Sequence, residues 1–196
     1  MLATTQGIVY DLEKEYRNPK SKLGRLVDEG KYTPVIRGLY ETNPNTPGLF
    51  ISSFYNPSYV SFEYALSKYS MIPEGVFMYT LATCEKHKTK MYHTPFGVYY
   101  CQDVPKSVFH IGIKKVEIGE YWYWIATPEK ALCDKLHSIK PIGKEETIEE
   151  LLFDDLRIDE DELFKFDLDL MKRITDHYHC SNVSLLNDYL RGCSDE

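Results

Sequence analysis

The chain has 196 residues, of which 43% are hydrophobic and 27% are charged, and its formal net charge is −7. This length supports one sizeable hydrophobic core with a small accessory module and excludes two large domains. The longest apolar runs are only a few residues, and no basic residue precedes Lys14, so the sequence predicts neither a membrane span nor a secretory signal. We therefore expect a soluble cytoplasmic protein.

Charge is distributed unevenly along the chain. Residues 145–196 hold 16 of the 30 acidic residues and 5 of the 23 basic residues, while the preceding part carries a small positive surplus. Any contact with nucleic acid is therefore expected from the first part, and the acidic C-terminal part is expected to face solvent or a basic partner. The five cysteines lack the spacing of a disulfide framework, which favours a reducing compartment.

Residues 1–47 are predicted to form a small module of two short helices and a β-hairpin. Apolar residues at helical spacing indicate the first helix: Ile8, Val9, Leu12 and Tyr16. Asn18 followed by Pro19 marks the start of the second helix, and Gly30 marks its end. Two short strands are expected to turn near Arg37 and Gly38, before an irregular linker at residues 43–48. This order is that of a winged helix-turn-helix that lacks one helix.

The second of these helices is the candidate DNA-binding element. Its apolar residues Leu23, Leu26 and Val27 face the core, which turns a polar face outward. The predicted DNA-contacting residues are Lys20, Ser21, Lys22 and Arg25 on this helix and Arg37 at the tip of the hairpin. Asp28 and Glu29 would repel phosphate. The alternative is a winged-helix fold retained for protein contact.

Residues 48–196 are predicted to form an α+β unit with a mixed or antiparallel sheet and C-terminal helices. The pattern indicates a helix from about Ser58 to Tyr69, strands near 76–82 and 109–118, and a hairpin around Thr94–Gly97. An aromatic strand then ends at Ala126 and a helix follows over 128–139, with Thr127 as its N-cap and Pro128 at its first position. The acidic part, residues 143–196, is expected to be helical.

Six aromatic residues in two predicted strands alternate between the faces of the sheet: Tyr99, Tyr100, Tyr121, Trp122, Tyr123 and Trp124. One set should therefore be buried. The other set would form an aromatic surface suited to a partner, unless the C-terminal helices cover it.

No recognisable catalytic or metal site emerges from the sequence. Cys84, His87, His93 and Cys101 lack the paired spacing of a zinc module, and His177 and His179 do not face one another on a helix. Asp167-x-Asp169 lacks the preceding Gly-Ser pair of a nucleotidyltransferase and more plausibly begins a helix. His110 and His137 have no partner visible in the sequence. We expect no cofactor, no metal and no enzymatic activity.

Three segments, in the same order along the chain, resemble the antitoxin family of AbiE-type (type IV) toxin–antitoxin systems, known as AbiEi. They are YNPSYVSFEYAL at residues 55–66, TPFGVYY at 94–100, and IATPEKALCDKL at 125–136. The family patterns are Y-x-P-S-Y-V-S-x-E-S-A-L, T-P-x-G-x-Y-x-Y and I-A-T-P-E-K-A-L-x-D-x-L.

The resemblance implies an abortive-infection antitoxin that neutralises a co-encoded nucleotidyltransferase-type toxin without requiring a stable complex. It also implies a transcriptional regulator that binds the promoter DNA of its own operon through the N-terminal module. Two other function classes stay open at this point. One is a stand-alone winged-helix transcriptional regulator, and the other is an enzyme with an unrecognised site around His110 or His137.

Overall fold

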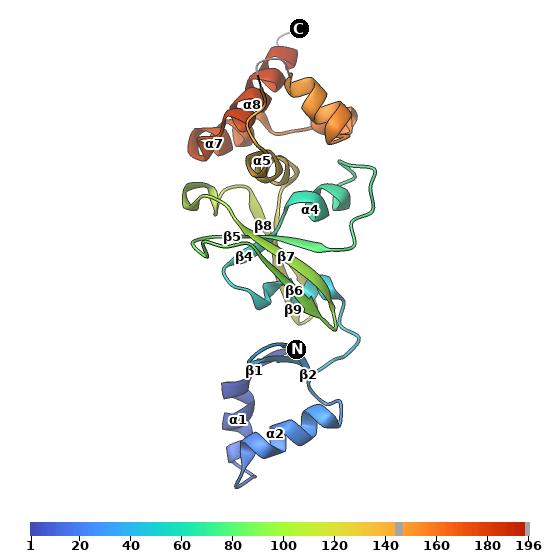
Figure 1. Ribbon diagram of the computed structural model, residues 1–196, viewed down its shortest axis with the longest axis vertical. Coiled ribbons are helices and arrows are strands. Elements are labelled where there is room, and N and C mark those ends of the chain that lie inside the picture. Colours follow the sequence, from blue (N-terminus) through green and yellow to red (C-terminus); the bar gives the residue numbers. More distant parts are fainter. Residues whose placement is uncertain (144–146, 195–196) are drawn as a thin grey trace.

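The structure is a computed structural model that describes residues 1–143 and 147–194, and it has a mixed α+β fold with two sheets (Figure 1). The smaller sheet has three strands in the order β1-β3-β2, and the larger has six in the order β6-β7-β5-β4-β9-β8. The small sheet and its helices lie at one end of an elongated molecule, and the last helices lie at the other end (Figure 1). We call residues 1–47 the head and the remaining described residues the body.

The head contains β1 (Leu2–Thr4), α1 (Thr5–Glu13), α2 (Pro19–Asp28), β2 (Thr33–Ile36) and β3 (Leu39–Glu41). The predicted helix start is confirmed, because the Asn18 side chain accepts a hydrogen bond from the Ser21 N–H over 3.3 Å and Pro19 occupies the first turn. The turn at Arg37 and Gly38 is also confirmed, with Gly38 at a φ of 88°. β1, which pairs with β3, was not predicted because three residues show no periodicity.

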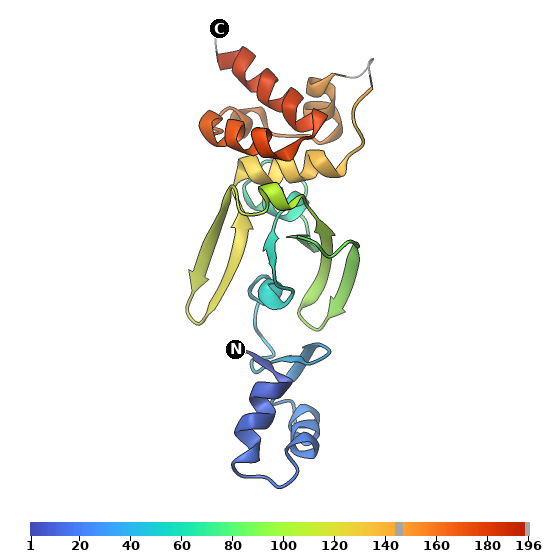
Figure 2. The same cartoon turned by 90° about the vertical axis from the view of Figure 1, so that its left-hand side faces the viewer.

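The body begins with α3 (Gly48–Ile51) and a 3-10 turn, η1 (Ser52–Phe54), and then builds the six-stranded sheet. The strands are β4 (Ser58–Val60), β5 (Tyr79–Thr83), β6 (Lys90–Thr94), β7 (Gly97–Asp103), β8 (Ile113–Ile118) and β9 (Tyr121–Ala126). The sheet is mixed as predicted, since β4 runs parallel to β9 and β5 parallel to β7, while the other neighbours are antiparallel. The β6-β7 and β8-β9 hairpins diverge on either side of β4 (Figure 2).

The predicted helix from about Ser58 was wrong at its beginning. Residues 58–60 form β4, and the helix α4 spans Phe62–Lys68. Val60 lies opposite Leu81 of β5 and Ile125 of β9, so this short segment gains ladder hydrogen bonds and complete burial on both sides. A β-branched residue suits such a position, and the tertiary pairing outweighs the helical spacing of the apolar residues.

Other strand boundaries shifted by a few residues. The strand expected near 76–82 is β5, and the one expected near 109–118 is β8, preceded by a 3-10 turn η2 at Lys106–Val108. The hairpin at 94–97 and the aromatic strand ending at Ala126 lie where predicted.

Helices close the far end of the body. They are α5 (Pro128–Ser138), a π-helical turn η3 (Glu150–Asp155), α6 (Glu160–Leu163), α7 (Leu168–Tyr178) and α8 (Ser181–Ser194). Thr127 caps α5 by accepting the Lys130 N–H over 3.4 Å, as predicted. The predicted acidic helical region 143–196 is helical in these elements, whereas residues 144–146 and 195–196 lie outside the described residues.

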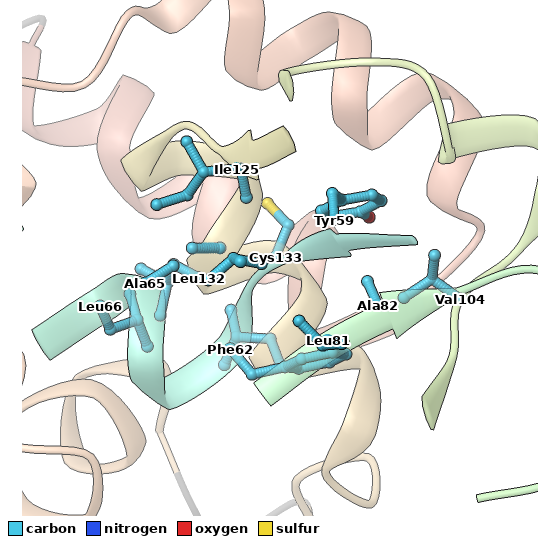
Figure 3. Packing of buried hydrophobic residues seen from close by; sticks show 14 of the residues in the cluster. Tyr59, Phe62, Ala65, Leu66, Leu81, Ala82, Val104, Ile125, Leu132 and Cys133 are labelled. Carbon is cyan, nitrogen blue, oxygen red and sulfur yellow. The ribbon is translucent and has the colours of Figure 1, made fainter. Parts of the chain in front are cut away.

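The hydrophobic core lies where α4 and α5 pack against the sheet (Figure 3). Leu81 on β5, Ile125 on β9 and Leu132 on α5 have no exposed surface. Burying a side chain of this kind contributes about 1.5–3 kcal/mol to folding, and the same cluster continues beneath α7 and α8 through Ile174 and Leu186. Across the described residues, no helix is both long and apolar enough to cross a membrane.

Candidate functional site

Three of the five predicted DNA-contacting residues lie together on the outer face of α2. Lys20, Ser21 and Arg25 are exposed, while Leu23 and Leu26 on the opposite face are buried. Gly24 lies between them on the outer face, and a side chain added there would meet no atom within 4 Å. The helix therefore presents a basic, unobstructed surface with a glycine at its centre.

Lys22 is only partly available on this surface. It is half-buried, and its ammonium group lies 5.1 Å from the centroid of the Tyr16 ring, a cation–π distance.

The two acidic residues at the end of the helix, Asp28 and Glu29, differ in whether they form an ion pair. Glu29 pairs with Lys31 over 3.1 Å, and that hydrogen bond lowers the pKa of Glu29. Asp28, also exposed, has no ion pair among the described residues and opposes the basic residues of α2.

Arg37 is exposed but does not join the α2 residues. It lies in the turn between β2 and β3, and the neighbouring Gly38 carbonyl accepts a hydrogen bond from the Thr5 N–H at the start of α1. α2 begins beyond the other end of α1, and a helix of nine residues is about 13 Å long. Arg37 therefore lies beside the start of α1, whereas the first residues of α2 follow the end of α1.

A buried ion pair lies at the centre of the body. Lys130 and Asp134, one turn apart on α5, are both fully buried, and the Lys130 ammonium donates to Asp134 Oδ1 over 2.7 Å. The ammonium also lies 4.7 Å from the Tyr178 ring centroid and 5.7 Å from that of Tyr59. Charges removed from water to this extent require complete pairing.

Three hydroxyl groups complete the pairing of the Asp134 carboxylate. Tyr178 donates to Oδ1 over 2.7 Å, and Oδ2 accepts from Tyr59 over 2.9 Å and from Ser61 over 2.6 Å. Burial, with the nearby Asp134 charge, raises the pKa of Tyr59 and of Tyr178 well above the ordinary value. Both tyrosines therefore remain protonated donors.

This network, Tyr59, Ser61, Lys130, Asp134 and Tyr178, ties β4 to α5 and α7. Lys130, Asp134 and Ser61 have no exposed surface, and Tyr59 and Tyr178 are each 2% exposed, so the network joins these elements from inside the core, and we call it the clamp. Sequence reasoning missed it. The available signal was the Lys-x-x-x-Asp spacing within a helix whose other inward residues, apart from Glu129, are apolar.

The predicted alternation of the aromatic strands is confirmed. Tyr99 and Tyr123 are buried, whereas Trp122 and Trp124 on the opposite face of β9 are 38% and 36% exposed. The C-terminal helices leave this aromatic surface open, and the Lys115 ammonium lies 5.2 Å from the Trp122 ring centroid.

A hollow of about 340 Å³ opens beside Trp124. It is lined by Asn56, Pro57, Ser58, Tyr59, Phe109, His110, Ile113 and Trp124. His110 is exposed there, and this lining includes no carboxylate or thiol that could orient it as a general base. His137 lies elsewhere, with its ring 4.9 Å from that of Tyr178, and burial lowers its pKa.

The other candidate metal ligands are scattered. Cys84 and Cys101 are buried, while His87 and His93 are exposed. Among residues 1–143 and 147–194, no group of three or more potential ligands is arranged to hold a metal. Asp167 caps α7, as predicted, by accepting the N–H groups of Asp169 and Leu170.

Comparison with models of protein families finds no match to this chain, and comparison with curated protein sequences finds none either.

Proposed function

We propose that this protein is an AbiEi-type antitoxin whose body neutralises a co-encoded nucleotidyltransferase-like toxin and whose head binds promoter DNA as a reduced winged helix-turn-helix. The observation that carries the proposal is the position of the residues that define the resemblance. Tyr59 and Ser61 come from the first segment, and Lys130 and Asp134 come from the third, and all four belong to the buried network.

The burial of these four residues in one network supports the idea that the body is built in the same way as in the resembled family. The two segments are tied by hydrogen bonds from Tyr59 and Ser61 to Asp134, which lies 75 and 73 residues further along the sequence. A chance similarity in two short segments would have no reason to converge on one carboxylate. The residues shared with the family would thus maintain the fold, and exposed surfaces of the body would act on the toxin or its target.

The head supports the regulatory half of the proposal. It places two helices against a three-stranded sheet, with the basic face of α2 exposed and the β2–β3 turn carrying Arg37. In helix-turn-helix proteins the second helix enters the major groove and neighbouring turns contact phosphates. The alternative, a head that contacts protein, would use the same exposed face.

Two assays test the two halves separately. Co-expression with the toxin gene that the proposal places beside this one should restore growth that the toxin gene alone suppresses, and continued arrest would contradict the antitoxin role. Binding to a duplex from the upstream region should weaken in Lys20→Ala and Arg25→Ala at every salt concentration. Lys14→Ala is the matched control, because it removes the same charge from α1. Equal binding by all four proteins would contradict the role of α2.

A stand-alone regulator is the second candidate, and the same exposed α2 face favours it. It predicts salt-sensitive operator binding without any effect on toxin-dependent arrest.

A further inference from the structure

The loop between β5 and β6 is held in a defined shape and presents lysine side chains outward. Glu85 and His87 adopt left-handed backbone conformations, each with a φ of 55°. Asp103 supports the loop, because its carboxylate accepts the His87 N–H over 2.6 Å and the Thr83 hydroxyl over 2.5 Å. Non-glycine residues persist in this conformation only where surrounding contacts impose it.

The positive charge of this loop is not neutralised. Within the described residues, Lys86, Lys88 and Lys90 form no ion pair, and the one acidic residue of the loop, Glu85, is paired with Lys106 over 2.9 Å. The Lys86 ammonium donates to the Asn56 carbonyl over 3.2 Å. Three lysines within five positions therefore create a local positive surface on an otherwise acidic protein.

Aromatic rings lie directly beneath these lysines. The Lys86 and Lys90 ammonium groups lie 5.2 and 6.0 Å from the Tyr55 ring centroid, and Lys90 lies 5.5 Å from that of Tyr92. Tyr55 and Tyr92 contact one another at 5.3 Å. Lys90 and Tyr92 lie on the face of the sheet that carries Tyr99, opposite to Trp124, whereas Lys86 reaches Asn56 at the end of the sheet.

The loop adjoins the hollow beside Trp124. Asn56 connects the two, because its backbone carbonyl accepts a hydrogen bond from the Lys86 ammonium and Asn56 also lines the hollow. The hollow has flat rings around it, namely Trp124, Phe109 and Tyr59, with His110 and the Asn56 amide as polar groups. A volume of about 340 Å³ lies at the lower end of the range for small-molecule sites, about 300–1,000 Å³.

We propose that this lysine–aromatic face, formed by Asn56, Lys86, Lys88, His110 and Trp124, binds single-stranded nucleic acid, with one base in the hollow and the adjoining phosphates on the two lysines. Base stacking on aromatic side chains and phosphate contacts with lysine are the two features of single-strand binding. A duplex would not fill the hollow, because its bases are stacked on one another. An acidic peptide would satisfy the lysines but would leave the ring-lined hollow empty.

The test is a binding titration of the full-length protein with a labelled single-stranded oligouridylate, compared with a duplex RNA of equal length. Trp124→Ala should weaken single-strand binding by about 5- to 150-fold, the usual effect of losing one stacked base. Trp122→Ala is the matched control, since it removes the same side chain at similar exposure on the same strand and does not line the hollow. Equal losses in the two variants would overturn the proposal.

A lysine series separates this face from the head. Lys86→Ala and Lys88→Ala should each reduce the slope of log affinity against log salt by about 0.7, the value for one phosphate contact on a single strand. Lys68→Ala, at the exposed end of α4, and Arg25→Ala on α2 should leave the slope unchanged. Duplex RNA or polyglutamate binding as tightly as the single strand would overturn the proposal, whatever the outcome of the promoter and growth assays.

Discussion

The hydroxyl of Tyr59 donates a hydrogen bond to Asp134 over 2.9 Å and so joins the central strand β4 to α5 across 75 residues of sequence. Asp134 is also the partner of the buried Lys130 ammonium. The body therefore depends on one carboxylate that satisfies donors from three secondary-structure elements.

Removing this carboxylate should destabilise the protein far more than removing one of its donors. Asp134→Ala leaves a buried ammonium unpaired, and we expect a loss of about 3–5 kcal/mol in the free energy of unfolding. Tyr59→Phe removes one hydrogen bond and keeps the ring, so we expect about 1 kcal/mol. Urea denaturation of both variants measures the difference, and similar losses would show that the pair is not the clamp inferred here.

The exposed carboxylate on α2 should limit DNA binding. Asp28→Asn removes a negative charge beside the basic residues, so we expect tighter binding to promoter DNA at low salt and a smaller gain as salt screens the charges. The measurement is a duplex titration at several salt concentrations. Asp11→Asn, on α1, is the control, and a gain of the same size there would assign the effect to net charge alone.

Gly24→Ala should have opposite effects on stability and on DNA affinity. A methyl group meets no neighbouring atom there, and alanine is favoured over glycine within a helix by about 1 kcal/mol, so the head should unfold at a higher temperature. The same methyl group would keep a DNA backbone from approaching α2, so affinity should fall. Calorimetry and duplex titration test the two effects, and unchanged affinity would place the contact elsewhere on the head.

The head and body are joined through Tyr121. Its hydroxyl donates to Glu41 Oε1 over 3.0 Å and shares a hydrogen bond of 2.9 Å with Thr46, while its ring stacks on Phe50. Glu41 is fully buried, and burial alone would raise its pKa, but hydrogen bonds from the N-terminal ammonium, the Asn43 N–H and the Tyr121 hydroxyl lower the pKa overall.

Tyr121→Phe should loosen this junction, because a buried carboxylate loses a donor. We expect faster proteolytic cleavage within residues 42–47 with little change in the unfolding of the body core. Tyr100→Phe is the control, since Tyr100 is half-buried and its hydroxyl forms no hydrogen bond within the described residues. Cleavage at the same rate in both variants would contradict the role of Tyr121.

Stability should fall in alkaline solution as tyrosines ionise in the unfolded chain. Burial raises the pKa of Tyr64 and of Tyr69 to about 12 in the folded protein, whereas an unfolded tyrosine has a pKa of about 10. Between these values the unfolded state binds fewer protons, so the free energy of unfolding decreases as the pH rises. Urea denaturation at rising pH tests this, and Tyr69→Phe should show a shallower decline than the unaltered protein.

Local chemistry was sufficient to predict several elements of the fold. The Asn18-Pro19 and Thr127-Pro128 pairs start their helices as expected because capping depends on a few neighbouring residues. The alternation of Tyr123 with Trp122 and Trp124 also predicted that one set of rings is buried and the other is not, since strand geometry sends successive side chains to opposite faces. The same local signals failed at residues 58–60, where β4 lies between two partners that are distant in sequence.

The sequence by itself determined the α+β class, the starts of α2 and α5, the β6-β7 hairpin and the exposed basic residues of α2, because local patterns of neighbouring residues carry these features. Only the tertiary structure revealed the clamp around Asp134 and the hollow beside Trp124. These features combine side chains from segments tens of residues apart, and their distances are set by how the strands pair and the helices pack.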